Sequence, residues 1–251
     1  MQAVVDDLMT HYSRSGKGKT VLLLHGWGDN LQTFSELQDR LRIGYDVIAL
    51  DLPGFGRTDA PQQSWGLDNY AQFVASFLGK INATPFAIVG HSNGGAISVR
   101  ALGTKVLSAK KLILLASSGV RGEYEGRNLL LRLVTKTGKA LVTPLPLKIK
   151  RRLRKQLYKT VGSDLLVAEH LQETFKKVVT DDVRQDAQNI TIPTLLIYGD
   201  KDQATPMKYA HMFNERFKNA KLVSLPEAGH FIHHQNAAEV NRTVLEFLDA
   251  K

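Results

Sequence analysis

Short apolar runs alternate with segments of helical periodicity over most of the 251 residues. The runs are brief and continuous, as in strands that are buried on both faces of a sheet. Between them, the clearest 3.6-residue period lies at residues 68–81. Together these patterns predict an α/β fold with a mostly parallel sheet flanked by helices. Strands are expected at residues 8–14, 20–24, 45–50, 86–89, 112–116, 192–198 and 220–225.

Local signals add detail at the ends of these elements. The turn-forming residues 15–19 are suited to a hairpin between the first two strands. Side chains that accept hydrogen bonds from free backbone N–H groups often precede a helix, and Pro is favoured at its first position. The expected N-caps are Asn30, Asp68 and Thr205, with Pro206 opening the helix after Thr205.

The alternation lapses between residues 120 and 188, where helix-like segments follow one another without a strand. An insertion of this kind predicts a helical cap over the carboxyl edge of the sheet, with residues 1–119 and 189–251 as the core. Residues 129–134 form a leucine-rich patch, and residues 148–161 read as a helix with an apolar stripe opposite a basic face. That face is either solvated or in contact with an anionic substrate or membrane surface.

The net charge of +9 is concentrated in this insertion. Residues 121–159 contain twelve Lys or Arg and two Glu, a net charge of +10, so the remaining chain carries −1. No zinc-finger spacing, RNP-like aromatic motif or helix-turn-helix pattern accompanies the basic residues. We therefore expect no nucleic-acid partner.

Composition also limits the available chemistry. The chain contains no cysteine, so it offers neither a thiolate nucleophile nor a Cys-ligated metal, and serine is the nucleophile it can supply. The first residues lack the basic and long apolar regions of a signal peptide, and no apolar run approaches the ~20 residues of a membrane span. These features favour a cytoplasmic protein without stable membrane insertion, and they leave the oligomeric state open.

The strand expected at residues 86–89 leads directly into Gly90-His91-Ser92-Asn93-Gly94, and a helix-like segment follows. A G-x-S-x-G pattern between strand and helix is typical of a nucleophile elbow, a sharp turn that exposes the serine hydroxyl at the edge of a sheet. Glycines flank the serine because the strained turn brings neighbouring residues close. Ser92 is thus the candidate nucleophile.

Two further motifs stand at strand ends. His25-Gly26-Trp27-Gly28 places backbone N–H groups where an oxyanion would need donors, although a plain glycine turn would give the same pattern. His230 follows a glycine after the last strand, and the chain order serine, aspartate, histidine matches a known order of catalytic triads. Asp202 lies farther along its loop than Asp200 and can bend back toward His230, so it is the favoured acid.

These motifs make the chain similar to capped esterases and meta-cleavage-product hydrolases of the α/β-hydrolase superfamily, over nearly its whole length. The resemblance implies an α/β-hydrolase fold with an inserted helical cap. Two features depart from relatives: Asn93 stands where many carry an apolar residue, and the absence of an HGGG loop argues against the hormone-sensitive-lipase-like branch. The matching segments are HGWG at 25–28, DLPGFGRT at 51–58, GHSNGG at 90–95, PTLLIYGDKD at 193–202 and AGHF at 228–231.

By this resemblance, Ser92 is the nucleophile, Asp202 the acid and His230 the base, while the backbone N–H groups of Trp27 and Asn93 form the oxyanion hole. The implied reaction is acyl transfer to serine followed by hydrolysis, without a metal or organic cofactor. The expected substrate is a small-to-medium, largely apolar ester or related carbonyl compound. Thioester hydrolysis, carbon–carbon bond hydrolysis of the meta-cleavage type and a non-catalytic ligand receptor on the same fold stay open as alternatives.

Overall fold

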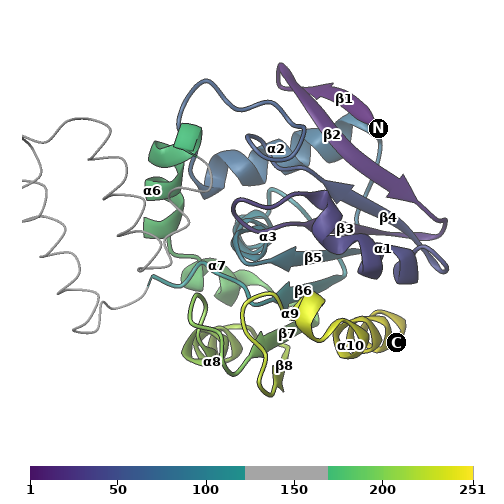
Figure 1. The fold of residues 1–251 in the computed structure, drawn as a ribbon, viewed down its shortest axis with the longest axis vertical. Coiled ribbons are helices and arrows are strands. Elements are labelled where there is room, and N and C mark those ends of the chain that lie inside the picture. The colour runs from purple at the N-terminus through teal and green to yellow at the C-terminus, as the bar shows by residue number, and fades with distance from the viewer. Residues whose placement is uncertain (122–168, 251) are drawn as a thin grey trace, which may run out of the picture.

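Eight strands form one sheet in the computed structural model, which describes residues 1–121 and 169–250 (Figure 1). Their order across the sheet is β1-β2-β4-β3-β5-β6-β7-β8. The six strands from β3 to β8 are parallel, so all their carboxyl ends meet at one edge. The strands are β1 (Gln2–Val5), β2 (Leu8–Ser15), β3 (Lys19–Leu24), β4 (Tyr45–Leu50), β5 (Ala87–His91), β6 (Lys111–Leu115), β7 (Thr194–Gly199) and β8 (Ala220–Leu225).

The expected hairpin between the first two predicted strands is wrong. The strand β2 pairs with β4 in antiparallel orientation, and β3 lies on the other side of β4. The hairpin instead joins β2 to the short strand β1, which the hydrophobic pattern did not reveal. Asp6 and Asp7 both have positive φ, at 47° and 63°, as a tight two-residue hairpin turn requires. The strand β3, whose last four residues are buried, has a parallel neighbour on each side, β4 and β5.

Helices cover both faces of the sheet, because alternate side chains of each strand point to opposite faces (Figure 1). Leu22 and Leu24 join a core with α2, α3, α7 and α8, whereas Val21 and Leu23 join a second core with α1 and α10. None of the described helices is long and apolar enough to cross a bilayer. The helices are η1 (Leu31–Phe34), α1 (Ser35–Leu41), α2 (Leu67–Lys80), α3 (Asn93–Gly103), η3 (Glu169–Leu171), α6 (Gln172–Thr180), α7 (Arg184–Asn189), α8 (Met207–Arg216), α9 (Ile232–Gln235) and α10 (Ala237–Asp249).

One of the three expected N-caps is confirmed. The side chain of Asn30 accepts a hydrogen bond from the backbone N–H of Gln32 and begins η1. The helix α2 begins two residues earlier than expected, so Gly66 is its N-cap and Asp68 lies in its first turn. Pro206 is the N-cap of α8, because the Thr205 side chain is directed to other partners at the carboxyl edge.

The insertion expected at residues 120–188 is described only from residue 169 onward, apart from its first two residues. The leucine-rich patch and the basic helix of residues 148–161 lie outside the described residues. Where the chain leaves and rejoins the core, the two segments are joined directly. The backbone N–H of Val183 donates to the carbonyl of Gly119 at 2.8 Å, and the N–H of Arg121 donates to Asp182 Oδ2 at 3.2 Å.

Arg100 on α3 reinforces this junction. Its guanidinium forms ion pairs with Asp68 on α2, at 2.6 Å, and with Asp181 and Asp186 on the returning segment, at 2.9 and 2.8 Å. Desolvation opposes the charge of Arg100, but the three carboxylates outweigh it and raise its pKa above the ordinary value. The return of the chain is thus tied to the helix that begins at the elbow.

Candidate active site

The strand β5 ends at His91, and α3 begins at Asn93, so Ser92 alone forms the corner between them. Its φ of 48° and ψ of −114° lie in a region that costs a non-glycine residue about 1–3 kcal/mol. A Cβ at Gly90 would lie 2.6 Å from the backbone of Gly95, and one at Gly94 would lie 2.1 Å from the carbonyl oxygen of Leu24. Both positions therefore require glycine, and the strained elbow expected from the sequence is present.

Asp202 and His230, from the loops after β7 and β8, form a hydrogen-bonded pair. Asp202 Oδ2 accepts a hydrogen bond from His230 Nδ1 at 2.8 Å, and Oδ1 accepts from the backbone N–H groups of Ala204 and Thr205. Burial would raise the pKa of Asp202, but the hydrogen bonds from His230 and Thr205 lower it below its ordinary value. The ionised carboxylate holds the His230 proton on Nδ1, so Nε2 is left as the basic nitrogen.

Thr205 was expected to cap a helix and instead positions this pair. Its Oγ1 lies 2.6 Å from Asp202 Oδ2, 3.0 Å from the carbonyl oxygen of Ala116 and 3.2 Å from His230 Nδ1. The buried hydroxyl thus connects the acid loop to the end of β6. Asp200, by contrast, is exposed.

The loop after β3 lies directly against the elbow. A Cβ at Gly26 would lie 3.2 Å from Ser92 Cβ, so the backbone that carries Trp27 runs beside the candidate nucleophile. The Trp27 ring packs against Phe55 and against Phe175 of α6, with centroids 4.9 and 5.1 Å apart. The Trp27 indole Nε1 and both side-chain polar atoms of Asn93 are buried without a partner among the described residues.

Asp51 organises the neighbouring loop, which begins the DLPGFGRT motif. Its carboxylate accepts hydrogen bonds from the backbone N–H groups of Leu31 and Arg57, at 2.7 and 2.9 Å, and lies 2.9 Å from His11 Nδ1. A Cβ at Gly56 would lie 2.3 Å from this carboxylate, which explains the glycine. The motif therefore acts as a structural support beside the elbow.

A group of histidines behind the elbow is the feature that the sequence analysis missed. His91 is buried, its Nε2 donates to the backbone carbonyl of His230 at 3.1 Å, and the two rings lie 4.9 Å apart. The ring of His233 lies 4.4 Å from that of His91. Burial lowers the pKa of His91 well below its ordinary value and that of His233 to about 3, so both rings are neutral at pH 7. The sequence signal for this group was that His91 lies next to Ser92 in the GHSNGG motif and that His233 follows closely after the AGHF motif.

A family model described as the alpha/beta hydrolase family matches residues 21–243. The chain belongs to this family. The match includes the elbow, the acid loop and the loop of His230, and it begins within β3. This hydrolase thus has the enzyme class and fold that its motifs predict.

Relatives of the hydrolase differ in their reported activities. The chain is 30% identical to a pimeloyl-[acyl-carrier protein] methyl ester esterase of Neisseria meningitidis over 87% of this chain and 74% of that protein. It is 29% identical to the dihydrolipoyllysine-residue acetyltransferase component of an acetoin cleaving system of Pseudomonas putida, over 96% of this chain but 66% of the relative. A solved esterase from Exiguobacterium antarcticum has a TM-score of 0.78 at 21% identity, with 99% of each chain covered, and shows the shared fold.

Proposed function

We propose that this hydrolase is a carboxylic ester hydrolase that acts through an acyl-enzyme, with Ser92 as nucleophile, His230 as base and Asp202 as acid. The observation that carries the proposal is the buried Asp202 carboxylate at 2.8 Å from His230 Nδ1, at the sheet edge that also holds the strained Ser92. A histidine held in this tautomer is the base that an elbow serine needs.

In the first step, His230 Nε2 takes the proton of Ser92 as Oγ attacks the ester carbonyl carbon. Asp202 stabilises the imidazolium that forms, and the same proton is then given to the leaving alcohol. Water attacks the acyl-enzyme in the second step, with His230 again as the base. The carboxylate of Asp202 stays ionised throughout because its pKa is lowered in the folded protein.

Backbone N–H groups of Trp27 and Asn93 are proposed to stabilise the oxyanion. Two observations support this assignment: the Trp27 loop lies against the elbow, and Asn93 begins α3, where free N–H groups and the helix dipole favour negative charge. Loss of one such donor costs roughly 3 kcal/mol of transition-state stabilisation.

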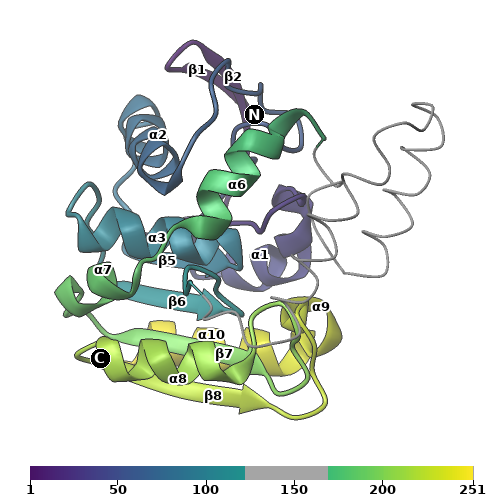
Figure 2. The ribbon, with the colours of Figure 1, turned by 90° about the vertical axis from the view of Figure 1, so that its left-hand side faces the viewer.

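The substrate is proposed to be a small-to-medium, largely apolar ester, held under a cap formed by residues 120–188. The described end of this insertion supports the proposal, since Phe175 of α6 packs against Trp27, and Leu171 lies against Gly54. Figure 2 shows the ribbon of α6 on the side of the molecule that faces the viewer. Each buried methylene adds about 0.8 kcal/mol of binding, so acyl bulk should raise kcat/KM until the cavity is full. The esterase names of the Neisseria relatives support an ester as the substrate class.

The test is a series of p-nitrophenyl esters of increasing acyl length, combined with a fluorophosphonate probe that labels active serines. We expect turnover of the short and medium esters and labelling of the wild type, both lost in Ser92→Ala. Turnover of matched thioesters or of a meta-cleavage dienone above that of every ester would overturn the ester assignment. Saturable binding of esters without turnover or labelling would overturn catalysis and indicate a receptor.

A further inference from the structure

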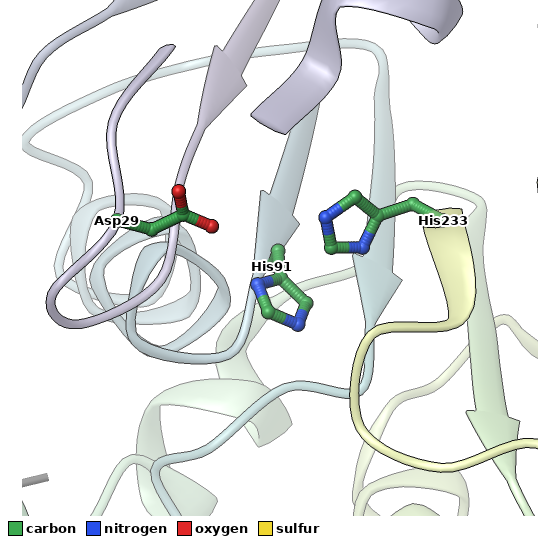
Figure 3. A group of neighbouring side chains, drawn as sticks. All are labelled: Asp29, His91 and His233. Atoms are coloured by element: carbon green, nitrogen blue, oxygen red, sulfur yellow. The ribbon is translucent and has the colours of Figure 1, made fainter. Parts of the chain in front are cut away.

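Three side chains from distant parts of the chain converge behind the elbow. Asp29 lies in the loop after β3, His91 ends β5 and His233 lies in α9. Each offers one ligand atom, and these atoms all lie within 4.8 Å of one another. Figure 3 shows the Asp29 carboxylate and the His233 ring pointing toward His91 from two sides. His91 and His233 are buried, whereas Asp29 is half-buried, so the group borders solvent at one point.

The hydrogen bonds of His91 determine where its lone pair lies. A carbonyl oxygen only accepts hydrogen bonds, so the contact of His91 Nε2 with the His230 carbonyl requires the proton on Nε2. In the neutral ring Nδ1 then carries a bare lone pair, and it is buried without a partner among the described residues. Figure 3 shows one ring nitrogen of His91 turned toward the Asp29 carboxylate.

The other two side chains are held in a similar way. His233 Nε2 lies 2.9 Å from the hydroxyl of Thr33, while its Nδ1 is buried without a partner in the described ranges. Asp29 Oδ1 accepts a hydrogen bond from the N–H of Asn30 at 2.8 Å, which orients the carboxylate. In metal sites, ligating histidines bond through their second nitrogen to a carbonyl or other polar group, and these partners orient the ring. For His91, this partner is the backbone carbonyl of His230.

We propose that Asp29, His91 and His233 form a binding site for a divalent transition metal of the zinc type. Two imidazoles and one carboxylate suit Zn²⁺ or Co²⁺, whereas Ca²⁺ and Mg²⁺ prefer oxygen ligands. Bonds of about 2.1 Å to one metal place its ligands roughly 3.4 Å apart, so closure from 4.8 Å needs only small side-chain rotations. Water or solute completes the coordination on the exposed side of Asp29.

A metal at this position would join the loop that carries Trp27, the elbow and the loop that carries His230. It would also draw electron density from His91, whose Nε2–H is bonded to the His230 backbone. The site is separate from the proposed triad and does not depend on the esterase assignment. Its consequence is a metal-dependent gain in stability, because the ion binds only when all three segments are folded together.

The test uses the full-length protein after dialysis against a chelator, titrated with ZnCl₂ by calorimetry and with CoCl₂ by visible absorption. We expect binding of one equivalent of each ion, a rise in the melting temperature and the visible bands of low-coordinate Co²⁺. Ca²⁺ and Mg²⁺ at the same concentration should leave the melting temperature unchanged. Asp29→Asn and His233→Gln should each weaken Zn²⁺ binding by more than about tenfold, since even loss of an outer hydrogen-bond partner costs about that much.

Three histidine variants are the matched controls. His234→Gln removes the exposed neighbour that also contacts Thr33, His211→Gln removes a remote exposed histidine, and His230→Gln removes the ring beside His91. All three should retain Zn²⁺ affinity. Failure of the wild type to bind, or binding that survives both ligand substitutions, would overturn the site. Loss of binding in a control variant would do the same by placing the ion elsewhere. If His233→Gln does not fold, Asp29→Asn decides alone, since its side chain is only half-buried.

Discussion

At the amino edge of the parallel strands, buried polar groups pair with one another, whereas at the carboxyl edge several of them stand alone. Lys111, at the start of β6, donates to the carbonyl oxygens of Phe247, Leu248 and Ala250 at the end of α10. Asp46, near the start of β4, accepts from Arg14 and Thr20. Lys111 thus satisfies free carbonyl groups at the end of a helix, and Arg14 neutralises the charge of Asp46, as expected of an edge that serves stability.

The carboxyl edge has the opposite character. Among the described residues, seven buried side-chain polar atoms have no hydrogen-bond partner, and five of these belong to Trp27, His91, Asn93 and His233. The same edge carries the positive φ of Ser92. Unpaired buried groups cost about 1–3 kcal/mol each, so this edge maintains donors, lone pairs and strain for ligands. The difference is what we expect if the proposed site draws on the carboxyl edge and stability on the amino edge of the same strands.

The largest expected effect is the loss of activity when the candidate nucleophile at the carboxyl edge is removed. Ser92→Ala should reduce kcat for a good ester substrate by about 10⁶-fold, because the attacking oxygen is lost. The urea midpoint should not fall, since the change removes no bond that stabilises the sheet. Ser118→Ala, a nearby half-buried serine, should keep wild-type kcat. Ester turnover by Ser92→Ala within tenfold of wild type would show that the carboxyl edge works through another group.

The second prediction compares two carboxylates on one loop. Asp202→Asn should lower kcat by about 10⁴-fold, because the amide no longer holds His230 in the basic tautomer. Asp200→Asn should leave kcat within about twofold, because its side chain is exposed. Steady-state kinetics on the same ester measures both variants. A greater loss in Asp200→Asn would mean that the wrong acid was assigned.

The third prediction concerns the amino edge, where a substitution should lower stability and leave activity unchanged. Lys111→Met keeps the length of the side chain but removes the donors at the end of α10, and it should lower the free energy of unfolding by about 2–3 kcal/mol. The kcat at 25 °C should be unchanged, since Lys111 lies at the far end of β6 from the site. Lys110→Met, an exposed neighbour, is the control. A stable but inactive Lys111→Met would contradict the division between the edges.

The smallest expected effect is a pH dependence of stability from Asp202. Because the folded pKa of Asp202 is lowered, its contribution to stability is fully present above its unfolded pKa of about 3.9 and is lost as the pH falls through the folded value. Asp202→Asn should therefore lose less stability than the wild type between pH 5 and acid pH, measured by urea unfolding. An equal loss in both proteins would show that other groups govern acid unfolding.

Much of the sheet could be predicted because its strands are short and mostly apolar. The predicted strand at residues 220–225 coincides with β8, and that at residues 45–50 coincides with β4. Pairing was harder, because residues of β2 pair with residues of β4 that lie far away in the chain, such as Tyr12 with Leu50, and no local pattern records which edge a strand will join. Helix starts shifted for a related reason: the tertiary partners of Thr205 outweighed its local preference as a cap.

For the site, the candidate triad could be predicted from the family motifs, whereas residues that act through contacts between distant segments could not. The elbow strain at Ser92 and the Asp202–His230 contact follow from glycine spacing and chain order. Thr205, His91 and His233 act through contacts between segments that lie far apart in the chain, so each alone resembles an ordinary polar residue. The catalytic roles of all five predicted site residues stay predictions: Ser92, Asp202, His230, Trp27 and Asn93.

The hydrogen bonds between Gly119 and Val183, and between Arg121 and Asp182, have a consequence for the evolution of this enzyme. They hold the two ends of the segment between Arg121 and Asp182 on the core, and they involve no residue within that segment. Doubling the length of a closed loop costs only about 0.6 kcal/mol, so the core can accept a longer, shorter or unrelated insertion at this point. Under the proposed cap assignment, a change of this insertion would alter substrate preference while the sheet and the loop of His230 stay the same.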